Sequence, residues 1–188
     1  MPVSDATLVL GSLSGDPRAF GELYDRYARL VRAICYDETH DVSRAQDLAQ
    51  EVFLRAYQKM NSLKEPEKFG PWLVAMTRNV CREFRRSRAR DRHQLIGLVP
   101  PEKGTTTPEP DPEGRLEKLA AALGALSEKE RLALHIYYLQ EQEIEQAQEL
   151  IGVSRSAFYR LLTSAKKKVE EFIKKQERAS ERHGRETK

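Results

Sequence analysis

The 188-residue sequence has few cysteines, few aromatic residues and no long apolar segment. Two cysteines are too few for a disulfide scaffold, and they fit a reducing compartment. Apolar runs such as Trp72–Met76 are far shorter than the roughly 20 residues that a membrane helix needs. Because the N-terminal residues show no basic segment followed by a long apolar one, we expect no signal peptide. These absences exclude membrane-spanning and secreted disulfide-rich proteins and predict a soluble cytoplasmic chain.

Catalytic and cofactor motifs are missing as well. The sequence contains no glycine-rich phosphate loop and no nucleophile elbow. Its four histidines lack the spacing of a metal site; they are His40, His93, His135 and His183. We interpret His135 as a packing residue, and Cys35 and Cys81 as small buried side chains. The sequence therefore predicts no metal, no cofactor and no enzymatic activity.

Charge is present in quantity and is unevenly distributed, although the net charge is only +3. Arg82–Arg92 holds six arginines against two acids, and Lys166–Lys188 holds nine basic residues against five acids. Between these basic blocks, Pro100–Glu117 has five acids against two basic residues. Clustered basic residues favour a polyanionic partner, although a solvated helix face produces the same pattern.

The spacing of apolar residues predicts an all-α protein of two small helical domains. Asp16 and Pro17 provide a helix cap and a first helical residue, and further helices are expected from about Asp41 and Pro71. Residues 98–114 contain five prolines and cannot form a helix. We predict a first domain over 1–96, a flexible acidic linker over 97–115, a second domain over 116–175 and a disordered charged tail over 176–188.

The second domain has the pattern of a helix-turn-helix. Ser127 and Glu130 form a predicted capping box, and Gly152 separates one helix from the next, which Ser154 caps. The second helix of this motif enters the major groove, and arginine can bond guanine there. The predicted DNA contacts of this helix are Ser154, Arg155, Ser156, Tyr159, Arg160, Thr163, Lys166 and Lys167. A helical hairpin with a charged outer face is the alternative interpretation.

Three longer stretches of sequence resemble a known family. The segments AFGELYDRYARLVRAIC, AQDLAQEVFLRAYQKM and FGPWLVAMTRNVCREFRRSRAR resemble region two of bacterial sigma factors of the extracytoplasmic-function type. The segments ALSEKERLALHIYYLQ and LIGVSRSAFYRLLTSAKKKV are similar to region four of the same family. The resemblance implies a protein that joins core RNA polymerase, recognises two promoter elements and assists DNA melting.

The resemblance also implies partners and residue roles. The partners are the clamp of the largest polymerase subunit, the β-subunit flap and promoter DNA, and the family allows for an anti-sigma factor. Polymerase contacts are implied at Asp47, Gln50, Glu51, Phe53, Leu54 and Arg55, with core packing an equal alternative for Phe53. Contacts to the melting −10 element are implied at Arg78, Asn79, Arg82, Arg85 and Arg86. The linker would lie in the polymerase cleft, where its acids either mimic nucleic-acid charge or act as a solvated tether.

The sequence departs from the family pattern in the helix-turn-helix. Gln146, Ala147 and Gln148 stand where the family has Glu-Ile-Ala, so a glutamine replaces a small residue at the close approach of two helices. This departure predicts weakened or altered recognition of the upstream element. The main rival function is a helix-turn-helix regulator that binds duplex DNA without polymerase, usually as a dimer. A protein-binding helical adaptor is a third alternative, and it predicts no salt-dependent DNA affinity.

Overall fold

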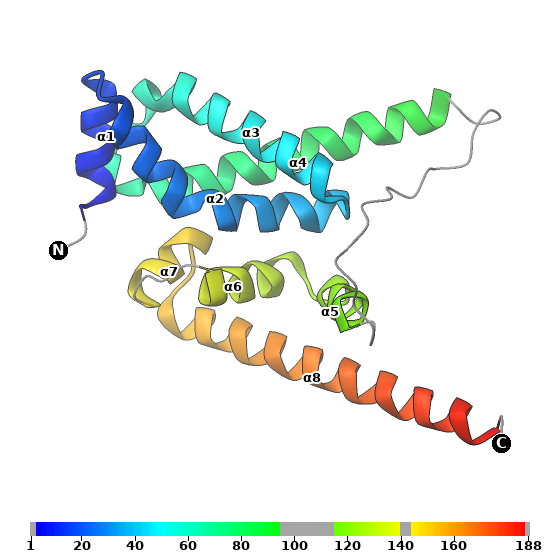
Figure 1. Ribbon diagram of the computed structural model, residues 1–188. Helices are drawn as coiled ribbons and strands as arrows, with labels where there is room; N and C mark the ends of the chain where they lie inside the picture. Colours follow the sequence, from blue (N-terminus) through cyan, green and yellow to red (C-terminus); the bar gives the residue numbers. More distant parts are fainter. Residues whose placement is uncertain (1–2, 95–114, 140–143, 187–188) are drawn as a thin grey trace. The chain divides into compact units, whose positions relative to one another are not determined.

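The computed structural model describes residues 3–94, 115–139 and 144–186. Within those ranges the chain forms helices and short connections and contains no strand, which confirms the predicted all-α class (Figure 1). The fold divides into two compact units, residues 1–106 and 107–188. Residues 95–114, which include all of the predicted linker except Arg115, lie outside the described ranges.

Unit 1 is a bundle of four α-helices with two short 3₁₀ segments. In chain order these are α1 (Asp5–Leu13), α2 (Pro17–Thr39), α3 (Val42–Lys59), η1 (Met60–Ser62), η2 (Pro66–Lys68) and α4 (Phe69–Gln94). Helix α2 packs against α1, α3 and α4, and α3 also packs against α4 (Figure 1). Their facing sides bury large apolar residues, including Leu23, Leu30, Val52, Phe69 and Leu73.

Two of the predicted helix starts in unit 1 are confirmed by their caps, and α4 begins at Phe69, two residues before the expected Pro71. The Asp16 carboxylate accepts a hydrogen bond from the Arg18 amide at 2.9 Å, and Pro17 is the first residue of α2. The Asp41 carboxylate likewise accepts from the Arg44 amide at 2.9 Å at the start of α3. A carboxylate at this position satisfies an amide that has no partner within the helix.

Helix α1 is an element that the sequence interpretation did not include. The Ser4 hydroxyl caps it by accepting from the Thr7 amide at 3.2 Å. Its Asp5 is then bonded to Arg26 and Tyr27 of α2. These contacts attach the N-terminal helix to the bundle by side chains that are 21 and 22 residues away in the sequence.

Unit 2 contains α5 (Arg115–Gly124), α6 (Glu128–Leu139), α7 (Ile144–Ile151) and α8 (Arg155–Glu186). Helices α5, α6 and α7 each pack against α8. The core of this unit includes Ala133 and Ile136 of α6 and Phe158 and Ala165 of α8, all fully or nearly fully buried.

The structure differs from the sequence prediction at the C-terminus. Helix α8 continues to Glu186, through most of the segment 176–188 that was expected to be disordered (Figure 1). The segment has no proline, and its commonest residues are arginine and glutamate, which favour helix without any tertiary contact. Lack of an apolar stripe therefore did not prevent the helix from propagating beyond its packed part.

Candidate functional site

The long helix α4 separates an apolar side from an arginine-rich side. Leu73, Thr77 and Val80 are buried, and the Thr77 hydroxyl donates to the Leu73 carbonyl at 2.8 Å. The predicted DNA-melting residues lie away from this side: Arg78 is half-buried, and the others are exposed, namely Asn79, Arg82, Arg85 and Arg86. The helix therefore presents several guanidinium groups and an amide to solvent along one stretch, as phosphate contacts require.

Two ion pairs modify the charge of this arginine-rich side. A guanidinium nitrogen of Arg85 lies 3.5 Å from a carboxylate oxygen of Glu38 in α2. The carboxylate of Glu83 lies 2.7 Å from Arg55 of α3, which also pairs with Glu51 at 2.5 Å. The bonds to Glu83 and Glu51 raise the pKa of Arg55, with the Glu83 bond the largest cause. The negative charge of Glu83, which lies among the arginines of α4, is thus neutralised by Arg55 of α3.

The predicted polymerase-contact residues of α3 fall into three groups. Asp47, Gln50, Glu51 and Leu54 are exposed, and Leu54 is 58% exposed despite being apolar. Arg55 is half-buried in the bridge to Glu83. Phe53 is buried, and its ring lies 4.6 Å from the ring of Tyr24. The assignment of Phe53 as a polymerase contact is therefore wrong for this conformation, because its position on the helix turns the ring into the bundle.

An exposed aromatic residue next to Leu54 was missed by the sequence interpretation. Helical spacing places Tyr57 on the same apolar stripe of α3 as Phe53, but it is 55% exposed. Its ring contacts that of Phe20 edge to face at 4.9 Å. Tyr24 of α2, whose ring contacts that of Phe53, is also partly exposed. The helical spacing that places Tyr57 four residues after Phe53 could not distinguish the centre of the apolar stripe from its edge.

The second unit contains the predicted helix-turn-helix. Helix α7 ends at Ile151 and is followed by Gly152, whose φ of +71° is readily adopted by glycine. The Gly152 and Val153 amides donate to the Gln148 carbonyl at 3.1 and 3.3 Å, and the Ser154 hydroxyl accepts from the Ala157 amide at 3.3 Å. Ser154 is therefore used as the helix cap. The following predicted DNA contacts are exposed on α8: Arg155, Ser156, Tyr159, Arg160, Thr163, Lys166 and Lys167.

Two of these lysines have partners within the protein. The Lys166 ammonium lies 4.1 Å from the ring centroid of Tyr137 and 5.5 Å from that of Tyr138, both in the last turn of α6. The Lys167 ammonium lies 3.8 Å from a carboxylate oxygen of Glu171. The cation–π contact restrains the ammonium of Lys166 more strongly than the exposed ion pair restrains that of Lys167, because exposed ion pairs contribute little.

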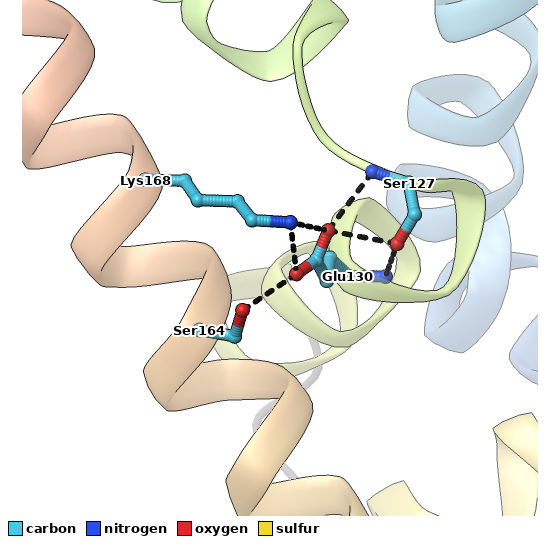
Figure 2. A network of polar contacts seen from close by, with 4 residues as sticks. All are labelled: Ser127, Glu130, Ser164 and Lys168. Carbon is cyan, nitrogen blue, oxygen red and sulfur yellow. Dashed lines mark hydrogen bonds and ion pairs between the residues drawn. The ribbon is translucent and has the colours of Figure 1, made fainter.

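A buried carboxylate joins α6 to α8 (Figure 2). Glu130 is 5% exposed. Its carboxylate accepts a hydrogen bond from the Ser127 amide at 3.0 Å, and its own amide donates to the Ser127 hydroxyl at 3.4 Å. These two reciprocal bonds confirm the predicted capping box. The Glu130 oxygens also accept from the Ser164 hydroxyl at 2.7 Å and the Lys168 ammonium at 2.7 and 2.9 Å. These bonds, led by that from Lys168, lower the pKa of Glu130 to about 2.

Other candidate chemistry is sparse in the part of the chain that the structure describes. There, no group of three or more histidines, cysteines or acids lies close enough to hold a metal ion. None of the described helices is long and apolar enough to cross a membrane. Cys35 and Cys81 are free and buried, as predicted, and a hydrogen bond to Cys81 together with burial raises the pKa of Cys35.

Comparison with protein-family models gives two matches. The model described as "Sigma-70 region 2" matches residues 23–91, which span most of α2, all of α3 and the arginine-rich side of α4. The model described as "Protein of unknown function DUF134" matches residues 81–178, just over half of the chain.

Comparison with individual proteins identifies relatives along most of the chain. The protein named "Probable RNA polymerase sigma factor RfaY" of Xanthomonas campestris pv. campestris is 33% identical over 162 residues, which cover 81% of this chain and 40% of RfaY. The ECF RNA polymerase sigma factor SigM of Bacillus subtilis is 28% identical over 79% of this chain and 91% of SigM. BldN of Streptomyces coelicolor, also named an ECF sigma factor, is 29% identical over 80% of this chain. The chain spans 58% of the length of BldN, so two of these three relatives are considerably longer.

Solved structures share the fold. CnrH, solved in complex with the cytosolic domain of CnrY, matches with a TM-score of 0.63 at 19% identity, over 90% of this chain and 97% of that one. The sigma factor RpoE of Bartonella quintana, solved with the anti-sigma factor NepR, matches with a TM-score of 0.57 at 20% identity, over 81% of this chain and 97% of that one.

Proposed function

Because this chain belongs to the bacterial RNA polymerase sigma factors of the ECF type, we propose that it binds core RNA polymerase, directs it to specific promoters and assists DNA melting. Through residues 81–178 it also belongs to the family described as DUF134, whose description names no activity. The observation that carries the proposal is the region-two match across α2, α3 and the arginine-rich side of α4. The protein acts in the cytoplasm as a transcription regulator without catalytic residues of its own.

The polymerase clamp binds the exposed side of α3. Leu54 and Tyr57 supply exposed apolar area there, and Asp47, Gln50 and Glu51 supply polar groups around it. Buried apolar anchors surrounded by polar residues are typical of protein interfaces. Arg55 supports this surface from within, since its guanidinium is bonded to Glu51 and Glu83.

The arginine-rich side of α4 contacts the −10 element and its melted strand. The exposed arginines, Arg82, Arg85 and Arg86, neutralise phosphates, and the Asn79 amide offers both a donor and an acceptor to a base or to the backbone. Half-buried Arg78 completes this side. We infer that the preceding segment, residues 61–68, receives an unstacked base of the melted strand.

The first turns of α8 contact the −35 element. Arg155, Ser156, Tyr159, Arg160 and Thr163 are exposed there, and Ser154 fixes the start of the helix as its cap. Lys167 adds a cation further along. The β-subunit flap binds this second unit, and the acidic linker binds in the polymerase cleft. An anti-sigma factor holds the chain inactive; the solved complex of RpoE with the anti-sigma factor NepR supports this proposal.

The proposal is tested by association with purified bacterial core RNA polymerase, followed by run-off transcription on fragmented genomic DNA. We expect stable association and transcripts that share a pair of upstream elements. A chain that does not bind core polymerase, yet binds duplex DNA with a steep salt dependence, would instead be the helix-turn-helix regulator.

Two variants with matched exposure localise the clamp contact. Leu54→Glu introduces a charge at a residue that is 58% exposed on α3, and Leu10→Glu does so at one that is 55% exposed on α1. We expect Leu54→Glu to weaken core binding by about tenfold or more, as for a central interface residue, and Leu10→Glu to have little effect. Equal binding by both variants contradicts the assignment of α3.

A further inference from the structure

The contact between α6 and α8 has an apolar centre with polar contacts on both edges. Ala133 and Ile136 of α6 are fully buried, as are Phe158 and Ala165 of α8. Apolar side chains alone permit sliding and rotation between two helices more readily than contacts that fix specific atoms. The polar contacts at the edges therefore determine how precisely α6 is held on α8.

One edge is formed by the Glu130 network at the N-terminal end of α6 (Figure 2). Ser164 and Lys168 lie one helical turn apart on α8 and both donate to Glu130. These residues therefore project from the same side of α8.

The opposite edge is formed by Lys166. At about 100° per residue, Lys166 is rotated by about 200° from Ser164, which places it across the apolar centre from the Glu130 network. Its ammonium lies over the rings of Tyr137 and Tyr138, at 4.1 and 5.5 Å from their centroids. Those tyrosines lie in the last turn of α6, whereas Glu130 lies in its first turn. The two edges thus hold opposite ends of α6.

We propose that Lys166 is a positioning residue, which clamps the C-terminal end of α6 onto α8 through Tyr137 and Tyr138 instead of binding a DNA phosphate. This inference rests on the proposed function for the role of α8 in DNA recognition. Lys166 follows Arg155 by eleven residues, or about 16 Å along the helix axis. Fixing the end of α6 fixes the point from which the chain leads, after Leu139, to α7 and the turn before α8.

The clamp itself is tested in the free full-length chain by NMR. The methylene protons next to the Lys166 ammonium lie over aromatic ring faces, so we expect their resonances to be shifted upfield. The shift disappears in the Tyr137→Leu, Tyr138→Leu variant and stays in a Lys174→Ala control, which alters another α8 lysine that pairs with Glu170. Lys166 resonances at ordinary positions would overturn the proposal, whether or not the chain binds polymerase.

The consequence for DNA recognition is tested with holoenzyme on a promoter fragment mapped by run-off transcription. Lys166→Ala and the double tyrosine variant should each weaken binding about two- to fivefold, the range of an exposed cation–π contact. Because both changes disrupt the same clamp, their effects should not add: the variant that combines Lys166→Ala with both tyrosine substitutions should also lose no more than about fivefold in promoter affinity relative to the wild type. Lys166→Arg should retain wild-type affinity, since guanidinium also binds ring faces.

Salt dependence separates the clamp from a phosphate contact. A lysine that binds a phosphate contributes about 0.9 to the slope of log affinity against log salt. We expect Lys166→Ala to leave that slope unchanged. A slope reduced by about 0.9, with losses that multiply in the triple variant, would overturn the proposal. Failure of the wild-type chain to join core polymerase would instead reject the proposed function, and the NMR measurement would still decide the clamp.

Discussion

Replacing Glu130 by glutamine removes the charge from the buried network between α6 and α8 while keeping a side chain that can cap α6. Glutamine also occurs in capping boxes, so the bonds to Ser127 can persist. The substitution therefore removes mainly the charge-assisted bonds from Lys168 and Ser164, which are 2.7 to 2.9 Å long. Breaking a buried ion pair by removing one partner is destabilising.

The magnitude follows from the pKa of Glu130, which falls from its ordinary 4.5 to about 2 in the folded protein. At about 1.36 kcal/mol per pKa unit, this corresponds to at most about 3.4 kcal/mol of folding free energy. Lys168 is 49% exposed, so solvent screening reduces the contribution to about 2 kcal/mol. Because the folded pKa is lowered, the contribution is fully present above pH 4.5 and is lost as the pH falls towards 2.

Urea unfolding of the wild type and of Glu130→Gln tests this value. Far-UV circular dichroism follows both units, whereas fluorescence of Trp72, the single tryptophan, follows unit 1. We expect the variant to lose about 2 kcal/mol in the unit 2 transition at neutral pH, with the Trp72 transition unchanged. The difference between the proteins should shrink towards zero at about pH 2.

Glu170→Gln is the matched control, because Glu170 pairs with Lys174 at 2.5 Å on the exposed side of the same helix. We expect it to change the unfolding midpoint little, since exposed ion pairs contribute little. The reasoning about Glu130 is refuted by a loss below about 0.5 kcal/mol at neutral pH, or by a difference that does not change between neutral pH and about pH 2.

Three further predictions concern the helix-turn-helix and α4. Gln148→Ala should stabilise unit 2 by about 1 kcal/mol in urea unfolding, because the buried Gln148 Oε1 has no hydrogen-bond partner among the described residues; destabilisation would contradict this. Gly152→Ala should cost about 1 kcal/mol in the same assay and Gly152→Asn less, because φ there is +71° and asparagine tolerates that conformation; equal costs would contradict the strain. Arg85→Ala with Arg86→Ala should reduce permanganate-detected promoter opening by holoenzyme more than core binding, and equal losses would remove this side of α4 from DNA contact.

Local signals in the sequence predicted most of the helices and their ends. Asp16, Asp41 and the Ser127–Glu130 pair act on amides within three residues, so their roles depend on short-range geometry alone. Helix α1 was missed because it is short and its apolar residues are mostly consecutive, without the three- and four-residue spacing of a helical stripe. Its attachment depends on contacts of Asp5 with Arg26 and Tyr27, which lie far away in the sequence.

The side-chain environments of the candidate site could be predicted only in part. Phe53 and Tyr57 occupy the same stripe of α3, and only the packing of α2 shows that the first is buried and the second exposed. The contacts of Lys166 with Tyr137 and of Lys168 with Glu130 join residues about 30 to 40 positions apart. Helical periodicity gives the face of each lysine but not the side chain that lies opposite, so both contacts required the packed structure.

The bonds that join Glu130 to Ser164 and Lys168 close a loop of 34 to 38 residues that contains all of α7 and its turn. Both ends of that loop are held by side chains outside α7. The contacts of α7 are therefore not needed to compensate for the entropic cost of closing the loop between α6 and α8. Substitutions within α7, such as a glutamine at position 148, can therefore accumulate without releasing the helix that follows. Such a closed loop allows one helix of the proposed DNA-binding motif to change while the position of the other is retained.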